Sequence, residues 1–368
     1  MNELAQQTTN PALGVTIFAL GGLAGAVFYL PFKKVKNWAW ESYWMFYAVC
    51  GLVVVPWVLA LSMSPNVLSV IKSAPPQQLL FCYLCGAMWG VGGLTWGLMI
   101  RYLGVGLGLA IGCGLCSATG TLIPPIIKGN LGSLYGTPAA NATLLGVVIS
   151  LFGIVLVGMA GMSKESELPE EEKKKAVAEY SFKKGILVAM FSGIMSAGMS
   201  FGLQGGAALE KLAGTTDPVT PLAWRGMPVL VVVLLGGFTI NFLWCLMLNV
   251  KNKTFSDYTK ANTPLVANII FAGLAGAIWC SQFICFKTGE PAMGPTSYIG
   301  WAVLMASAIL FSTLLGIMRG EWKGTSGRTR GLLGMGLALL LVSSVVAGYS
   351  GYLGQSDKAP EAKPAATK

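Results

Sequence analysis

Apolar residues run along the chain in long stretches, and charged residues fall almost only between these stretches. A helix needs about twenty apolar residues to cross the hydrocarbon core of a bilayer. Backbone polar groups in lipid must be hydrogen-bonded within a closed structure, and these stretches are too long for barrel strands. The pattern predicts ten transmembrane helices, near residues 12–32, 38–63, 78–100, 103–127, 142–162, 184–208, 226–249, 263–287, 296–318 and 331–353.

Composition agrees with this pattern. Hydrophobic residues make up 54% of the 368 positions, charged residues 11%, and the mean hydropathy is +0.65. A soluble protein carries about a quarter charged residues. The apolar runs begin without a preceding cluster of basic residues, so we expect no cleavable signal peptide. The chain is therefore predicted to be an all-α integral membrane protein.

The basic residues predict how the helices are oriented. Most of the 25 lysines and arginines fall in the odd-numbered loops, beginning with Lys33 and Lys34 and then Arg101. The positive-inside rule places these loops in the cytoplasm and both termini outside, in a bacterial-type plasma (inner) membrane. Anionic lipid of the inner leaflet would bind these three residues as an inner-face charge cluster. The net charge of +10 therefore indicates membrane lipid as a partner and no nucleic acid.

The ten predicted helices divide into two sets of five. A charged cytoplasmic linker, 163–183, separates a first repeat, 1–162, from a second repeat, 184–354, and a disordered tail follows at 355–368. "GAMW" in the third helix matches "GAIW" in the eighth. An odd number of helices in each half would give two inverted repeats, a common design of secondary transporters. The alternative is that both motifs are only packing positions with small residues.

Polar and aromatic residues inside the predicted helices are the candidate substrate-binding residues. Ser192, Ser196, Ser200 and Gln204 recur at every fourth position and form one polar stripe. Hydroxyl and amide groups interleaved with indole rings suit a neutral sugar, although interhelical hydrogen bonds and interfacial aromatic belts are the alternative. The candidates are Trp89, Thr95, Trp96, Ser196, Ser200, Gln204, Asn241, Trp279, Gln282, Tyr298 and Trp301.

Charged residues narrow the substrate class. All of them fall at predicted helix ends or in loops, and a charge at mid-depth would mark an ion pathway or a charged ligand. A neutral solute is therefore favoured. With no histidine in the chain, a coupled proton would need a carboxylate, and the candidates are Glu41, Asp217 and Glu210. Surface charge is the alternative for each, and for Glu41 it is an ion pair with Lys33, Lys34 or Arg101.

Enzymatic motifs lack the context that their chemistry needs. "GMSFG" fits the nucleophile pattern of serine hydrolases, but it lies in a predicted helix of a chain without histidine. The two Cys-x-x-Cys pairs lie in apolar helix interiors, where buried thiols act as small hydrophobic groups. We therefore expect no enzyme, no metal and no cofactor other than a coupling proton, and no obligate protein partner is evident.

Long motifs of the first half resemble the L-rhamnose–proton symporter family of the drug/metabolite transporter superfamily. They are "FYLPFKKVKNWAWE", "GAMWGVGGLTWGLMIRYLGVGLGLAIG" and "GTLIPPI", with further likeness at "MSAGMSF", Asp217–Pro218, "YIGW" and Glu321–Trp322. The resemblance covers nearly all of the chain except the central loop and the tail. It implies ten helices in two inverted halves and proton-driven uptake of L-rhamnose.

The chain also departs from the family pattern. Ser297 stands where family members have an acidic residue, and the segment 287–295 looks shortened. The first interpretation is a proton-coupled importer of a neutral deoxy sugar, most specifically L-rhamnose, working by alternating access. The alternatives are an exporter or facilitator of another small neutral metabolite within the superfamily, and a membrane sensor that binds sugar without moving it.

Overall fold

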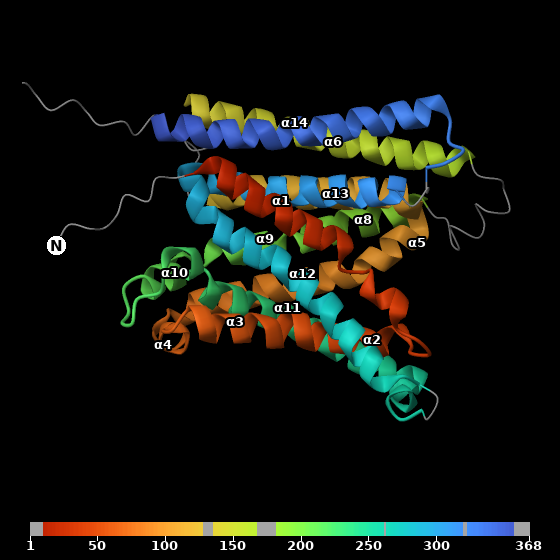
Figure 1. The fold of residues 1–368 in the computed structure, drawn as a ribbon, viewed down its shortest axis with the longest axis horizontal. Helices are drawn as coiled ribbons and strands as arrows, with labels where there is room; N and C mark the ends of the chain where they lie inside the picture. The colour runs from red at the N-terminus through yellow and green to blue at the C-terminus, as the bar shows by residue number, and fades with distance from the viewer. Residues whose placement is uncertain (1–9, 128–134, 168–181, 261–262, 319–321, 357–368) are drawn as a thin grey trace, which may run out of the picture.

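The computed structural model describes residues 10–127, 135–167, 182–260, 263–318 and 322–356. Within these ranges the chain forms helices joined by short turns, and no strand is present. Most helices lie roughly along one direction and form a bundle (Figure 1). Most of the predicted linker 163–183 and of the tail 355–368 lies outside the described residues.

The first half runs from α1 to α6. Its elements are α1 (Pro11–Val27), the 3₁₀ turn η1 (Pro31–Lys34), α2 (Trp40–Val49), the π-helical turn η2 (Cys50–Val54), α3 (Val55–Met63), α4 (Val67–Ser73), α5 (Pro76–Ile127) and α6 (Pro138–Glu167). α2, η2 and α3 follow one another without a break and form the predicted helix 38–63. A π-turn inside a helix adds one residue and is frequent at functional sites.

The second half runs from α8 to α14. Its elements are α8 (Phe182–Ser196), α9 (Gly198–Gly205), α10 (Ala207–Ala213), η4 (Leu222–Trp224), α11 (Met227–Asn252), η5 (Thr254–Tyr258), α12 (Leu265–Met293), η6 (Gly294–Ile299), α13 (Gly300–Met318) and α14 (Gly327–Ser356). The predicted helix 184–208 is thus divided into α8 and α9, and α12 extends beyond the predicted end at residue 287.

α5 replaces two predicted helices, 78–100 and 103–127, with unbroken helical backbone. A straight helix would hold positions 99 and 112 about 20 Å apart. A Cβ atom built on Gly112 would nevertheless lie 2.7 Å from the Met99 Sδ atom, so α5 must fold back on itself. The bend makes two limbs. Both limbs flank α8, because Gly92 lies against Ser196 and Gly193 lies against Gly112.

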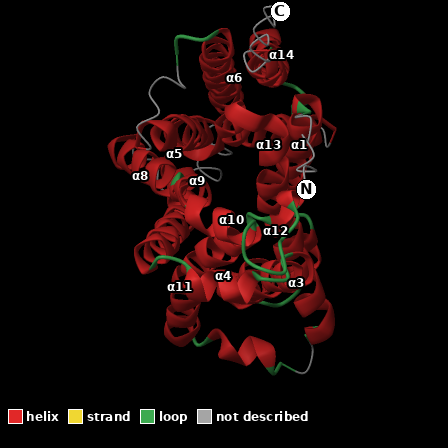
Figure 2. Cartoon of the chain, turned by 90° about the vertical axis from the view of Figure 1, so that its left-hand side faces the viewer, coloured by secondary structure: helices red, strands yellow, loops and turns green. Residues whose placement is uncertain are grey.

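Nine helical segments in the described part of the chain are long and apolar enough to cross a membrane. The second limb of α5 contains a shorter apolar helix, Ile111–Pro124. Turning the molecule shows the helices stacked in several rows, with α6 and α14 at one edge and α3, α4 and α11 towards the other (Figure 2). The fold is that of an integral membrane protein.

Basic residues gather at one end of the bundle. We define the basic end as the end that carries η1, η5 and the α13–α14 turn, with Lys33, Lys34, Lys253 and Lys260. The opposite end carries α4, α10, the start of α1 and the end of α14 (Figure 1). Three of the loops predicted to be cytoplasmic, those that carry η1, η5 and the α13–α14 turn, therefore share one end.

Candidate functional site

Aromatic rings from several helices gather inside the bundle. The rings of Trp89 from α5 and Trp279 from α12 lie 4.9 Å apart between centroids. Tyr47 of α2 contacts the edge of Trp279 at 5.9 Å, and Phe283 packs on Trp279 at 4.6 Å. Phe283 in turn stacks on Trp301 of α13 at 6.3 Å. Four helices therefore place these five rings in one continuous group, which we call the aromatic cluster.

The two "GA-x-W" motifs place Trp89 and Trp279 in this cluster by allowing close helix contacts. Gly86 lies against the backbone of Val233 in α11, where a methyl group would overlap the Val233 carbonyl. Gly276 lies in the same way against the backbone of Tyr47 in α2 and Gly51 in η2. Such small residues allow helix backbones to approach closely in membranes. Both motifs therefore act in close helix packing, and the tryptophan of each lies in the aromatic cluster.

The polar stripe of α8 and α9 is hydrogen-bonded to both limbs of α5. Thr95 and Ser192 share a hydrogen bond of 2.8 Å, and the Trp96 indole donates to Ser196 at 2.9 Å. Ser200 donates to the Gly120 carbonyl at 2.6 Å. These are the interhelical hydrogen bonds that the sequence left as the alternative.

Gln204 ends the stripe next to the aromatic cluster. Its amide donates to Ser200 at 2.6 Å and to the Gly120 carbonyl at 3.1 Å. Trp301 meets the same turn of α5, because its indole donates to the Cys116 carbonyl at 3.3 Å and lies against Gly120. The stripe and the cluster therefore meet at Gly120.

Asn241 and Gln282 lie at other edges of the cluster. The Trp44 indole donates to Asn241 at 2.9 Å, and Trp44 packs on Tyr47 with 4.5 Å between ring centroids. Gln282 is 5% exposed and donates to the Trp279 carbonyl, while its Oε1 atom lies against Gly25 of α1. The structure therefore brings Trp89, Trp279, Gln282 and Trp301 together, with Asn241 joined to them through Trp44 and Tyr47.

Some predicted residues lie elsewhere. Lys33 and Lys34 are exposed in η1, where the Lys33 ammonium lies 5.9 Å from the centre of the Tyr29 ring. The side chains of Arg101 and Tyr298 lie outside the described part of the structure, although both positions have helical backbone. Asp217 is exposed in the turn between α10 and η4.

Glu41 is buried at the basic end and has neutral partners there. It is 5% exposed and accepts hydrogen bonds from the Asn252 amide at 2.8 Å and the Thr254 hydroxyl at 3.0 Å. The expected alternative, an ion pair with Lys33 or Lys34, is therefore wrong for these two exposed lysines. Glu41 joins the start of α2 to the end of α11.

Glu210 has a partner that the sequence did not reveal. The Lys287 ammonium, 2% exposed, contacts Glu210 Oε1 at 2.5 Å, contacts Glu290 Oε2, and donates to the Leu203 carbonyl at 3.1 Å. The alternative of an unpaired surface charge is therefore wrong for Glu210, because it pairs with a buried cation. α12 continues past Pro291, so Lys287 lies inside the helix. The Lys287–Glu290 spacing of three residues was the available signal.

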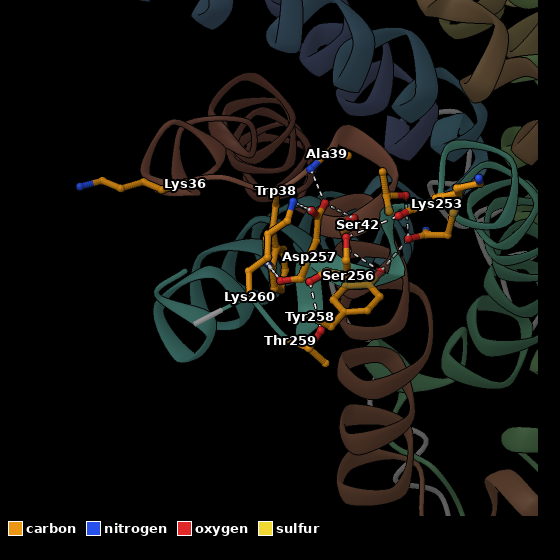
Figure 3. A network of polar contacts seen from close by, with 12 residues as sticks. Lys36, Trp38, Ala39, Ser42, Lys253, Ser256, Asp257, Tyr258, Thr259 and Lys260 are labelled. Carbon is orange, nitrogen blue, oxygen red and sulfur yellow. Dashed lines mark hydrogen bonds and ion pairs between the residues drawn. The ribbon is translucent and has the colours of Figure 1, made fainter. Parts of the chain in front are cut away.

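A second network, centred on Asp257 of η5, was also missed by the sequence. Asp257 is 3% exposed and accepts hydrogen bonds from the Ala39 amide at 2.7 Å, the Ser42 hydroxyl at 2.8 Å and the Lys260 ammonium at 2.6 Å. The Trp38 indole donates to its backbone carbonyl at 2.9 Å (Figure 3). The network holds the start of α2 against η5 at the basic end.

Asp257 is expected to contribute stability that depends on pH. Burial opposes its ionisation, but the hydrogen bonds from Ala39, Lys260 and Ser42 outweigh burial and hold the pKa of Asp257 below its ordinary 3.8. The ionised carboxylate therefore stabilises the fold above pH 3.8, and this contribution is lost as the pH falls through the lowered pKa. We expect Asp257→Asn to cost about 1.5–3 kcal/mol at pH 7, as for hydrogen bonds to charged groups.

The measurement is the midpoint of thermal unfolding in mild detergent, at pH 7 and at pH values below 3.8. The difference between wild type and Asp257→Asn should shrink in acid. Ser256→Ala, an exposed change in the same turn, is the matched control and should unfold like the wild type at both pH values. Equal midpoints for Asp257→Asn and wild type at pH 7 would contradict the prediction.

The fold and this buried arrangement define a polytopic integral membrane protein. Residues 8–352 match the model of the family described as "L-rhamnose-proton symport protein (RhaT)". The chain is 32% identical to the L-rhamnose-proton symporter of Cronobacter sakazakii over 340 residues, which cover 91% of this chain and 96% of that protein. The L-rhamnose-proton symporters of Citrobacter koseri and Escherichia coli are each 33% identical over 340 residues, covering 91% of this chain and 97% of theirs.

The chain belongs to the L-rhamnose-proton symport family. The resemblance found in the motifs of the first half is thereby confirmed. The family is one of transporters, so the expectation that the chain is not an enzyme is also confirmed.

Proposed function

We propose that this protein imports L-rhamnose together with protons across a bacterial inner membrane. The observation that carries the proposal is the family match along residues 8–352, together with relatives named L-rhamnose-proton symporters that match over 91% of the chain. Proton is the coupling ion in this proposal, and the substrate is a neutral sugar.

We propose a ten-helix architecture of two inverted repeats, with the two limbs of α5 as the third and fourth helices. Two observations support it. α1 packs on α12 and α13, and α8 and α9 pack on α5, which are equivalent pairings if the halves are related by a twofold axis. Trp89 and Trp279 occupy equivalent motifs and contact each other. Equivalent residues meet where such an axis passes, so the axis would run through the aromatic cluster.

The sugar site proposed here is the aromatic cluster and its polar neighbours. Transporters with inverted repeats bind substrate near the midplane between the halves. Indole rings would cover the apolar face and the methyl group of L-rhamnose, and Gln282, Asn241 and Gln204 would bind its hydroxyl groups. The remaining candidates, Thr95, Trp96, Ser196, Ser200 and Tyr298, complete the proposed set, and those on the stripe would act by shaping the contact between α8, α9 and α5.

Alternating access would use the two ends of the bundle in turn. With the basic end in the cytoplasm and both termini outside, opening to the cytoplasm would require the Asp257 and Glu41 contacts between α2, α11 and η5 to separate. Opening to the outside would involve α10 and the end of α12. Glu41, Asp217 and Glu210 are the proposed candidates for the proton carrier.

The first test is uptake of labelled L-rhamnose by purified protein in liposomes, with and without an inward proton gradient. Accumulation that follows the gradient is the expected result. Uptake at the same rate with and without the gradient would identify a facilitator, which is the alternative function. If the protein neither bound nor transported L-rhamnose but transported another deoxy sugar or a pentose, the assignment of L-rhamnose as substrate would be wrong. Ser297 and the segment 287–295, where the chain departs from the family pattern, would then be the first residues to test for sugar specificity.

Trp279→Ala is expected to reduce L-rhamnose transport by at least about 10- to 100-fold, since a single missing methylene in a hydrophobic pocket already costs roughly 1–3 kcal/mol. Trp279 is 6% exposed and contacts Trp89, Tyr47 and Phe283. Trp244→Ala is the control, because Trp244 is 44% exposed on α11. Initial uptake rates and thermal midpoints should be measured for both. Full transport by Trp279→Ala would remove this ring from the sugar site.

A further inference from the structure

The buried ion cluster at the opposite end of the bundle has a composition that suits a proton-binding site. It consists of Lys287 and Glu290 on α12 and Glu210 on α10. Of the lysines that the structure describes, Lys287 is the one that is buried. Its three N–H donors go to two carboxylates and the Leu203 carbonyl, so the ammonium is fully hydrogen-bonded. Removing a charge from such a cluster has a large energetic effect because the medium is poorly polarisable.

The charges of the cluster do not balance. One cation faces two carboxylates, so the fully ionised cluster carries one excess negative charge. Binding one proton makes the cluster neutral. An unbalanced charge in this position is costly, whereas a neutral cluster can rearrange with less penalty. The cluster can therefore exist in two states that differ by one proton.

The two carboxylates are not equivalent. Glu290 lies on the same helix as Lys287, three residues away, so this pair persists however the helices move. Glu210 lies on α10, and its side chain is 35% exposed compared with 16% for Glu290. The Glu210–Lys287 pair therefore joins two helices, and water reaches Glu210 most readily. Of the two carboxylates, Glu210 is therefore the one that can exchange a proton with water and whose ion pair breaks when α10 and α12 move apart.

We propose that Glu210 carries the coupled proton and that Lys287, held by Glu290, is the residue that positions it. This assignment rests on the proposed function of proton symport. A proton from water binds the Glu210 carboxylate, the ion pair with Lys287 breaks, and Lys287 keeps its protons and its pair with Glu290. The proton returns to water on the other side of the membrane, and the pair re-forms.

The ion cluster is connected to the proposed sugar site through two helices, α12 and α9. Lys287 lies on α12 about 12 Å along the axis from Trp279. Its bond to the Leu203 carbonyl fixes α9 at the position next to Gln204, which meets Trp301 at Gly120. Separation of α10 from α12 would therefore change the position of the sugar-binding helices. This gives a physical route for the coupling free energy of about 1–3 kcal/mol that cotransport requires.

Other titratable or charged groups near Glu210 come from each neighbouring element. Cys82 of α5 is close enough to interact electrostatically with both Glu210 and Lys287. Lys72 of α4 is exposed, and the Arg225 side chain donates to the Thr220 carbonyl and lies against Gly214. Lys211, the next residue on α10, is exposed. Among these groups, Lys287 is the charged partner in direct contact with Glu210.

The test compares wild type, Glu210→Gln and Glu210→Asp in liposomes and in detergent. Glu210→Gln should keep exchange of labelled for unlabelled L-rhamnose and lose accumulation driven by a proton gradient. Its sugar affinity should become independent of pH, and it should take up no proton from an unbuffered solution with a pH-sensitive dye when L-rhamnose is added. Glu210→Asp should recover part of the accumulation and of the pH dependence. Lys211→Gln, a charge change at the adjacent exposed position, should behave like the wild type.

The outcomes separate this assignment from the proposed function. Gradient-driven accumulation by Glu210→Gln, beside a wild type that also accumulates, would overturn the role of Glu210 and leave proton symport intact. A folded Glu210→Gln that loses exchange together with accumulation would show a structural role and also overturn the assignment. A wild type that does not accumulate L-rhamnose with the gradient would instead overturn the proposed function.

Discussion

Gly86→Ala is expected to prevent most of the protein from folding. A Cβ atom at Gly86 would overlap the carbonyl oxygen of Val233, and Gly236 on the facing helix has the same contact with the backbone of Tyr83. Both partners are backbone atoms, so no side-chain rotation can relieve the overlap. Inserting a methyl group into a packed core costs about 1–3 kcal/mol, and more where nothing can move. We expect at least the upper end of this range and a large loss of monodisperse protein.

Gly93→Ala is the control for this prediction. Gly93 lies on the same limb of α5, and a Cβ there would meet only the Trp89 ring, at 3.8 Å, an ordinary contact. Alanine is favoured over glycine in a helix by about 1 kcal/mol, so this variant should fold as well as the wild type or slightly better. The yield and elution profile after size-exclusion chromatography in detergent check both variants. A normal profile for Gly86→Ala would show that α5 and α11 do not approach as closely as described.

Hydropathy predicted most of the membrane-crossing segments because each must satisfy its own backbone in lipid. The exception is α5, where Gly112 returns to Met99 without a break in helical backbone. Arg101 suggested a loop there, since charges usually mark helix ends. A turn whose residues are themselves helical leaves no such signal, and only the contact between Met99 and Gly112 reveals it.

The candidate site was predictable in its residue types and less so in its partners. The "GA-x-W" motifs drew attention to Trp89 and Trp279, but the contact between the two rings depends on how α5 and α12 cross. The periodic serines indicated one helix face and could not show whether it meets another helix or a substrate. The structure places hydrogen bonds to α5 along that face.

The buried charges were the least predictable feature. Lys287 stands at the end of an apolar run, where a charge is normally exposed. Its burial depends on two features of the tertiary structure. α12 continues as a helix past Pro291, and α10 brings Glu210 to the ammonium. Likewise, Asp257 is buried because η5 folds against the amide of Ala39.

Lys287→Met is expected to destabilise the protein by about 3–5 kcal/mol at neutral pH. Removing one member of a buried ion cluster leaves the remaining charges without compensation, and here two carboxylates would face each other. The loss should become smaller as the pH is lowered, because protonation of the carboxylates removes their repulsion. Thermal midpoints in mild detergent, measured across a pH series, check both parts of the prediction.

The triple variant Lys287→Met, Glu210→Gln and Glu290→Gln separates stability from transport. Replacing a whole buried ion cluster by neutral groups is often neutral or stabilising, so the triple variant should regain the midpoint of the wild type and lose the pH dependence of Lys287→Met. It should still fail to accumulate L-rhamnose with a proton gradient, because no titratable pair remains between α10 and α12. If the single and triple variants were equally unstable, Lys287 would stabilise the fold through the packing of its aliphatic chain against Gly226, and its charge would not be the cause.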